Sequence, residues 1–230
     1  MLPQLHRKSA RSLLSSSALH IAPRNPFDGV SVGTSTNDEQ KYFIDRNTFT
    51  KVTDTYPNWQ WKKVGALTRY GGLRCSSEVT LLKWSDIDWD ENRFKVTSPK
   101  TGRCGKKTRI VPLFPELRKC LVETSKEEDA DEKWVVRMLS GKPSKNLGTT
   151  FKKIVHRDGV DVWPKPFQNL RASRQTELER EHTTHVVCDW LGNTPTIAHK
   201  HYLTTTEDDF KRAVGRLRRP KIDGCRAGVE

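Results

Sequence analysis

Helical periodicity dominates the chain from about residue 44 onward. Apolar residues recur there at three- and four-residue spacing, as they do in amphipathic helices. Pro57 separates the first two of these segments, because proline cannot continue a helix. The pattern predicts helices over 46–55, 59–70, 76–84, 116–124, 147–156, 170–181, 184–191, 196–202 and 207–217. We therefore expect a domain that is mainly helical.

The period changes between residues 93 and 113. The segments 93–98 (RFKVTS) and 108–113 (TRIVPL) alternate or run apolar with β-branched residues, which is typical of strands. Between them, 99–107 (PKTGRCGKK) is a polar turn that contains proline and glycine. This stretch predicts a β-hairpin with a basic tip. The fold class is therefore α+β, mainly α-helical, with a small antiparallel sheet.

The two ends of the chain differ from this regular part. Residues 1–24 carry Arg7, Lys8, Arg11 and Arg24 but no acid. We interpret 1–27 as a basic helical remnant of an upstream domain, in preference to a mitochondrial transit peptide. The segment 28–43 is polar, rich in Gly, Ser and Thr, and is predicted to be a linker. The main domain then spans 44–214, and 215–230 is a basic C-terminal tail.

Composition narrows the class of partner. The 230 residues include 41 Lys and Arg against 28 Asp and Glu, which gives a formal net charge of +13 and a pI near 9.7. Such an excess favours a polyanionic partner, with nucleic acid first and an anionic membrane second. A basic protein without such a partner is the alternative. Since no apolar run approaches the roughly 18 residues of a membrane span, we expect a soluble chain.

The cysteines indicate neither a disulfide framework nor a zinc site. There are five, an odd number, and no pair has C-x-x-C spacing. Reduced thiols in a cytoplasmic compartment are the simplest interpretation. The sequence also contains no convincing His, Asp and Glu set for a metal. We therefore predict no metal and no cofactor.

Four side chains are candidates for chemistry. Arg74 follows two glycines, Lys100 lies on the hairpin tip, Arg171 starts a predicted helix, and Tyr202 lies near the chain end. Each also has a local interpretation. Arg74 could pair with Glu78 one turn further on, and Lys100 could be a solvated turn residue. Arg171 could cap or pair locally, and Tyr202 could be a packing residue.

Taken together, in order and spacing, these residues resemble the catalytic domain of the tyrosine recombinase (phage integrase) family. The resemblance covers about 44–213 and is strongest in 66–90 and 167–202. The short segments DIDW, PKTG and VPLFPEL are also similar to that family's connecting segments. The blocks that carry it are Gly72-Leu73-Arg74 with Glu78, Lys100 on a hairpin, Leu170-Arg171, and Leu191-Gly192 followed by Tyr202 ten residues after the glycine.

The resemblance implies a DNA breaking-rejoining catalytic fold and a transesterification mechanism. Tyr202 would attack the scissile phosphate, form a 3′-phosphotyrosyl link and release a 5′-hydroxyl. Arg74 and Arg171 would hold the non-bridging oxygens and stabilise the developing charge. Lys100 would donate a proton to the departing oxygen. Glu78 would support the site, and the arginines would serve as the charge clamp without a metal.

The resemblance also implies the partners. Double-stranded DNA is the expected substrate, with basic contacts from Arg103, Lys106, Lys107 and Arg109 around the hairpin. A tetramer on paired sites is expected, and the tail 215–230 would either reach a neighbouring chain or fray. No membrane is expected, and the protein would work in the cytoplasm on the nucleoid.

The sequence departs from the family pattern at several points. Gln168 stands where the family usually has His, and Asn193 where it usually has His or Trp. Neither amide titrates near pH 7, so general-base help would be lost at Gln168. His185, His199 and His201 lie near in sequence and could partly substitute. The gap from Arg74 to Glu78 is one residue longer than usual.

The upstream part also departs from the family. Members carry a helical core-binding domain, of which 1–27 would be the last helix. The chain would then be truncated or unusually short, with weak DNA binding that depends strongly on salt. Two alternatives to a recombinase stay open: a catalytically silent DNA-binding remnant of a mobile element, and a type IB topoisomerase-like enzyme.

Overall fold

The structure is a computed structural model that describes residues 40–99, 107–127, 131–139, 147–157, 159 and 161–216. All of these residues belong to one compact unit. The predicted segment 1–27 and most of the predicted linker 28–43 lie outside the described residues. So do Lys100, Arg103 and Lys106, and nearly all of the tail 215–230.

The described residues are mainly helical, as predicted. The helices are α2 (Arg46–Asp54), α3 (Trp59–Arg69), α4 (Pro115–Ser125), α5 (Leu147–Arg157), α6 (Pro166–Leu178), α7 (Thr184–Leu191), α8 (Pro195–His201) and α9 (Glu207–Arg216). Several begin at a residue whose side chain accepts a backbone N–H of the first turn. Asp45 caps α2, Asn58 caps α3 and Thr194 caps α8 in this way.

The three-stranded sheet is antiparallel, in the order β1 (Ile87–Asp88), β2 (Arg93–Thr97) and β3 (Thr108–Pro112). The predicted hairpin corresponds to β2 and β3, in which Phe94 lies opposite Val111 and both are buried. The strand β1 was not predicted, because two residues are too few to show an alternating pattern.

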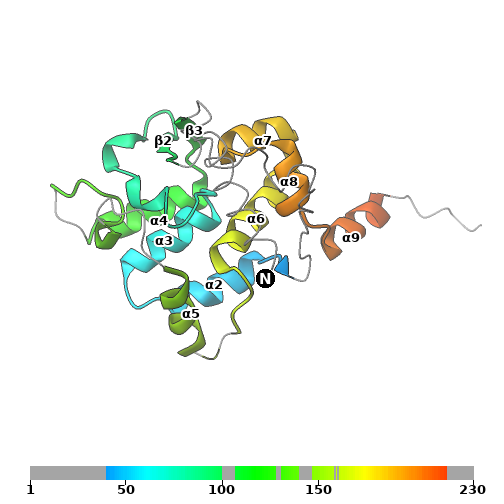
Figure 1. Cartoon of the computed structure of the whole chain (residues 1–230), viewed down its shortest axis with the longest axis horizontal. Coiled ribbons are helices and arrows are strands. Elements are labelled where there is room, and N and C mark those ends of the chain that lie inside the picture. The colour runs from blue at the N-terminus through cyan, green and yellow to red at the C-terminus, as the bar shows by residue number, and fades with distance from the viewer. Residues whose placement is uncertain are drawn as a thin grey trace, which may run out of the picture. The chain divides into compact units, whose positions relative to one another are not determined.

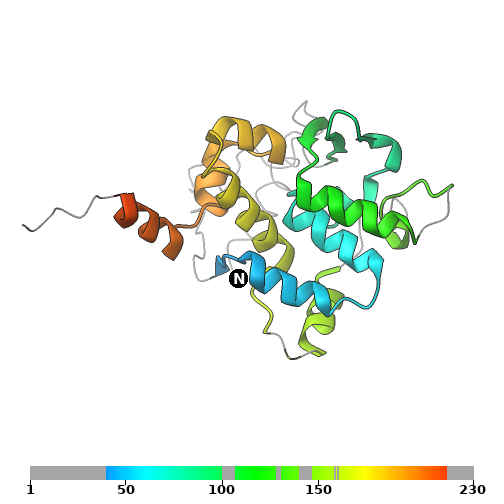
Figure 2. The same cartoon turned by 180° about the vertical axis from the view of Figure 1, so that it is seen from behind.

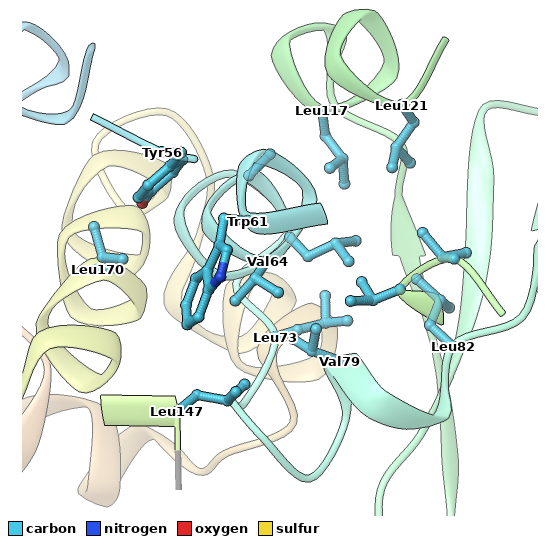
Figure 3. Close-up of a cluster of buried hydrophobic side chains, with 14 of the residues drawn as sticks. Tyr56, Trp61, Val64, Leu73, Val79, Leu82, Leu117, Leu121, Leu147 and Leu170 are labelled. Atoms are coloured by element: carbon cyan, nitrogen blue, oxygen red, sulfur yellow. The ribbon is translucent and has the colours of Figure 1, made fainter. Parts of the chain in front are cut away.

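Helix α3 lies in the middle of the fold and packs on α4 and α6 (Figures 1 and 2). Val64 and Leu67 of α3 are fully buried, and Figure 3 shows Val64 close to Leu73 and Val79 from the segment that follows the helix. This core fixes the end of α3, from which the chain runs directly into Gly71–Arg74. The central packing thus sets the position of Arg74.

An ion pair joins α3 to α6. Arg69 is fully buried, and its Nη1 and Nη2 donate to the two carboxylate oxygens of Glu177 at 2.9 and 2.5 Å. Nη2 also donates to the carbonyl of Ile44 at 3.0 Å, while the Ile44 N–H donates to Ser173 of α6 at 2.8 Å. These bonds hold α6 in register with α3, so Arg171 of α6 has a defined place beside the loop that carries Arg74.

The predicted helix over 76–84 is wrong. The segment forms a turn followed by two short 3₁₀ helices, η2 (Val79–Leu81) and η3 (Trp84–Asp86). The backbone of Leu82 and Trp84 hydrogen-bonds to Val135 and Lys133 instead of continuing a helix. The apolar spacing is still used, because Val79 and Leu82 are buried in the core. Helix α6 also begins four residues earlier than predicted, at Pro166.

Candidate active site

Glu78 is the centre of a buried charge cluster. It is 1% exposed and contacts three arginines from different parts of the chain. Arg109 of β3 makes a forked pair with it, with Nη1 2.8 Å from Oε1 and Nη2 2.7 Å from Oε2. Arg74 places Nη1 2.5 Å from Oε1, and Arg171 places Nη1 3.8 Å from Oε2. One carboxylate therefore gathers Arg74 and Arg171, which are 97 residues apart in sequence (171 − 74).

The three arginines also bind the last turn of α7. Successive carbonyl oxygens accept from different guanidinium groups: that of Trp190 from Arg109, that of Leu191 from Arg171 and that of Gly192 from Arg74. The C-terminal end of a helix presents unpaired carbonyls with partial negative charge, which suits cations. The cluster is thus held between Glu78 on one side and the end of α7 on the other.

Two glycines make this close approach possible. Gly192 ends α7 with φ +68°, and a Cβ there would lie 3.1 Å from Cδ and Nη1 of Arg109. Gly72 has φ +65°, and a Cβ there would lie 2.1 Å from Cδ2 of Leu191. The Gly72 carbonyl also accepts from Arg171. Glycine is therefore required at both positions for two reasons: a side chain would clash with its neighbours, and the backbone has a positive φ.

The charges of the cluster shift the pKa values of Glu78 and Arg171. Burial alone would raise the pKa of Glu78, but the hydrogen bonds and charge of Arg109, with the charges of Arg171 and Arg74, lower it to about 2. Burial and the neighbouring charge of Arg74 lower the pKa of Arg171 to about 10, partly offset by Glu78. At neutral pH both groups are therefore charged, and the cluster holds three cations and one anion.

Tyr202 lies against this cluster. It follows α8, whose Ala198 carbonyl accepts from the Tyr202 N–H at 2.9 Å. Its ring centre lies 5.6 Å from the guanidinium carbon of Arg171. This separation is typical of a cation–π contact. Thr176 of α6 donates to the Tyr202 carbonyl at 3.4 Å. Helix α6 therefore supplies a cation beside the tyrosine ring and a bond to its backbone.

A second contact with α6 lies just beyond the tyrosine. Arg180 follows the last turn of α6, and its Nε lies 2.9 Å from Oδ1 of Asp209 in α9. Its Nη2 also donates to the hydroxyl of Thr206. The segment from Tyr202 to Asp209 is therefore held at its start by Thr176 of α6 and at its end by Arg180, which follows α6.

The basic residues predicted around the hairpin are placed differently from one another. Lys107 is exposed, and its carbonyl accepts from the Ser98 N–H at 2.8 Å. Arg109 was expected to contact DNA, but its side chain is 10% exposed and is engaged with Glu78 and Trp190. The hairpin also meets Arg74 directly, because Arg74 Nη1 donates to the Ser98 hydroxyl at 3.2 Å.

The two residues that depart from the family pattern are also near the cluster in sequence. Gln168 is exposed on α6, one turn before Arg171. Asn193 directly follows Gly192, and its amide Nδ2 donates to Oε1 of Gln175 at 2.8 Å. Its Oδ1 is buried and has no hydrogen-bond partner among the described residues. The amide of Asn193 is therefore turned toward α6, through Gln175, a residue that the sequence analysis did not single out.

Among the described residues, no group of three or more His, Cys, Asp or Glu is arranged to hold a metal ion. None of the helices in the described part of the chain is long and apolar enough to cross a membrane.

The mainly helical fold with its small antiparallel sheet is that of solved tyrosine recombinase structures. The chain belongs to the Phage integrase family, whose pattern matches residues 52–207. No individual curated protein matches the sequence significantly. Membership of this family supports site-specific DNA recombination as the activity.

Solved structures share the fold at low sequence identity. The XerA recombinase superposes with a TM-score of 0.58 at 18% identity, over 88% of this chain and 72% of that chain. The Tn1549 transposon integrase in complex with transposon right end DNA gives 0.64 at 16%, over 90% and 76%. A lambda integrase tetramer bound to a Holliday junction gives 0.61 at 15%, over 84% of this chain and 56% of that chain.

Proposed function

We propose that this protein cuts and rejoins duplex DNA at specific sites, with Tyr202 as the nucleophile. The observation that carries the proposal is that Arg74 and Arg171 meet at Glu78 and that the Tyr202 ring lies against Arg171. These residues come from separate segments, and their convergence supplies a nucleophile beside a cluster of cations.

The chemistry follows from those side chains. The Tyr202 oxygen bonds to phosphorus, the bond from phosphorus to the 5′-oxygen breaks, and a 3′-phosphotyrosyl link remains. Arg74 and Arg171 stabilise the negative charge that builds on the non-bridging oxygens. In the reverse step a 5′-hydroxyl attacks the phosphotyrosyl link, restores the DNA backbone and releases Tyr202. Each step exchanges one phosphoester bond for another, so rejoining needs no energy source.

Lys100 is the proposed acid for the departing 5′-oxygen. Lys100 lies outside the described residues, and the proposal rests on its place in the family motif and on its closeness in sequence to Ser98, whose hydroxyl accepts from Arg74.

Gln168 and Asn193 are proposed to help bind the phosphate without transferring protons. Amide groups donate hydrogen bonds but do not titrate near neutral pH. Neither position 168 nor position 193 would then offer a histidine to accept the proton of the Tyr202 hydroxyl. We therefore propose a slow enzyme.

The proposed partner is double-stranded DNA, for which the net charge of +13 is suited. Lys107, with Arg103 and Lys106, is proposed to contact its backbone. Assembly as a tetramer on paired sites, in the cytoplasm where the nucleoid lies, belongs to the same proposal. The proposed domain division is 1–27, 28–43, 44–214 and 215–230.

Covalent trapping tests the proposal. The protein and its Tyr202→Phe variant are incubated at low salt with nicked duplexes from the flanks of its own genomic locus, and a denaturing gel is read for a protein–DNA adduct. We expect an adduct with the unaltered protein and none with the variant. DNA binding without an adduct, also after an upstream core-binding domain is supplied, would contradict the enzyme and leave a DNA-binding protein.

A further inference from the structure

We propose that Arg109 is a positioning residue of the active site, which neutralises Glu78 so that Arg74 and Arg171 keep their positive charge for the phosphate. This inference rests on the proposed recombinase function. It gives Arg109 a role different from the DNA contact expected from its place in a basic hairpin.

The hydrogen bonds of Arg109 leave it little capacity for a ligand. Each of its three side-chain nitrogens donates: Nε to the Trp190 carbonyl at 2.7 Å, and Nη1 and Nη2 to the two oxygens of Glu78 at 2.8 and 2.7 Å. The fork is the strongest geometry for an arginine on a carboxylate. Arg109 would have to break it to reach DNA.

The side chains of the other two arginines make fewer hydrogen bonds to Glu78 than Arg109 does: Arg74 makes one, at 2.5 Å, and Arg171 makes none. Arg74 uses one guanidinium nitrogen on one oxygen, and its side chain is the most exposed of the three, at 18%. The Nη1 atom of Arg171 is 3.8 Å from the carboxylate. That separation is beyond hydrogen-bond distance. The carboxylate of Glu78 is therefore shared between Arg109, which binds both of its oxygens, and the side chain of Arg74, which binds one, while Arg171 lies outside hydrogen-bond distance of it.

A charge count shows what this arrangement does. With three arginines and one carboxylate, the cluster carries a net charge of +2 toward an incoming phosphodiester. Without Arg109 the net charge would be +1, and the charge of Glu78 would be shared only by Arg74, which already binds it, and Arg171. Because the site is buried, such pairs would be poorly screened and would compete directly with the phosphate.

Arg109 also joins the sheet to the helix that leads to the proposed nucleophile. It lies on β3, which pairs with β2, and it binds the last turn of α7, which leads through α8 to Tyr202. Gly192 provides the space, since a Cβ there would meet the Arg109 side chain. Loss of Arg109 would thus affect both the charge and the spacing of the site.

The two effects are separated by a set of variants. Arg109→Met removes the charge, Arg109→Lys keeps the charge without the fork, and Arg109→Met/Glu78→Gln removes both charges. The matched control is Arg93→Met on β2, whose side chain is 53% exposed and pairs with Asp88 at the surface. Adduct formation is timed on the nicked duplex, and DNA affinity is measured separately for each substitution in a Tyr202→Phe background.

The expected results are as follows. Arg109→Met slows adduct formation by about 10- to 100-fold, as removal of a residue supporting a charged site does, while DNA affinity changes by less than about threefold. Arg109→Lys and Arg93→Met stay within about threefold of the unaltered rate. The double variant forms adduct about tenfold faster than Arg109→Met, because Arg74 and Arg171 are no longer neutralised.

Each contrary result has one meaning. If the unaltered protein forms no adduct, the proposed function fails, and the inference fails with it. If the unaltered protein reacts and Arg109→Met reacts equally fast, Arg109 has no role in the site. If the double variant is no faster than Arg109→Met, the role of Arg109 is structural and charge neutralisation is overturned. The same holds if a folded Arg109→Lys protein reacts as slowly as Arg109→Met. If Arg109→Met does not fold, the rate of Arg109→Lys is the test, and a folded Arg109→Lys protein that reacts about tenfold or more slowly than the unaltered protein overturns charge neutralisation.

Discussion

The guanidinium carbon of Arg171 lies 5.6 Å from the centre of the Tyr202 ring. Arg171 is 2% exposed, and its Nε is buried without a hydrogen-bond partner among the described residues. The tyrosine ring is therefore one of the groups that cover this cation. Tyr202 therefore combines two features: its hydroxyl is the proposed nucleophile, and its ring packs on Arg171, a proposed phosphate contact.

Substitutions at Tyr202 should separate these two features. Tyr202→Phe keeps the ring, so we expect the free energy of unfolding to stay within about 0.5 kcal/mol of the unaltered protein. Tyr202→Ala removes the cation–π contact and should cost about 1–2 kcal/mol. Both variants should form no adduct. Denaturant unfolding measures the difference, and equal stability of the two variants would mean that the ring contact contributes nothing.

Glu78 should make stability depend on acid. Its pKa is about 2 in the folded protein against 4.5 ordinarily, so its contribution is fully present above about pH 4.5 and is lost as the pH falls toward 2. The difference corresponds to about 3 kcal/mol. Glu78→Gln should therefore unfold more easily at pH 7 and show a flatter decline between pH 5 and pH 2.

The control for this measurement is Asp54→Asn, an exposed acid at the end of α2. It makes the same change of charge away from the cluster, and its stability curve should follow that of the unaltered protein. Parallel curves for Glu78→Gln and the unaltered protein below pH 5 would contradict a coupled carboxylate.

Gly72 should tolerate no side chain. In Gly72→Ala the new Cβ would lie 2.1 Å from Cδ2 of Leu191 and would force a left-handed residue. We therefore expect a loss of about 2–4 kcal/mol. The matched control is Gly159→Ala, because Gly159 has φ +73° with nothing within 4 Å of the added Cβ.

This control separates the steric cause from the conformational one, since Gly159→Ala should cost only about 1 kcal/mol. In a double-mutant cycle of Gly72→Ala with Leu191→Ala, we expect a coupling of at least about 1 kcal/mol. Denaturant unfolding of the four proteins measures it. Additive losses would place the clash elsewhere.

The accuracy of sequence-based prediction differed between neighbouring elements for physical reasons. Helix α7 was predicted to the residue, because its apolar face is regular and Gly192 ends it in the left-handed conformation. The segment 76–84 has similar apolar spacing but is not an α-helix, since its backbone pairs with residues 133–135, which no local pattern reveals. Helix α6 was predicted to start too late because the proline at its first turn, which favours a helix start, was not used.

The candidate site shows the same limit. The motif spacing pointed to Arg74, Arg171 and Tyr202, and the structure brings these three together. The inward position of Arg109 had a usable signal, because it lies two residues before the buried Val111 and so on the same face of β3. Its forked pair with Glu78 had none, since that contact depends on how β3 packs against the turn after α3.

Gln168 offers a direct test of the slow-enzyme proposal. It is exposed one turn before Arg171, so Gln168→His should leave the free energy of unfolding nearly unchanged. A histidine there could accept the proton of Tyr202, and we expect adduct formation to rise by about tenfold or more, with a new dependence on pH between about 6 and 7. The control is Gln40→His, which makes the same substitution at a residue whose backbone carbonyl accepts from the side chain of Asn169. An unchanged rate would show that the lack of a histidine at position 168 to accept the Tyr202 proton does not limit the reaction.

The last prediction concerns self-association through α9. Phe210 and Val214, four residues apart on this helix, are 61% and 67% exposed. Side chains at this spacing lie on one face of a helix, so the two form an apolar stripe. If the proposed tetramer uses this stripe, Phe210→Ser should raise the protein concentration needed for assembly on paired-site DNA by about tenfold or more, because buried aromatic anchors dominate interfaces.

Val122→Ser on α4, where Val122 is 43% exposed, is the matched control and should assemble normally. Sedimentation of protein–DNA complexes measures assembly, while binding to a single site should be unchanged for both variants. Normal assembly of Phe210→Ser would exclude α9 as the contact between subunits and direct the search to another surface of the domain.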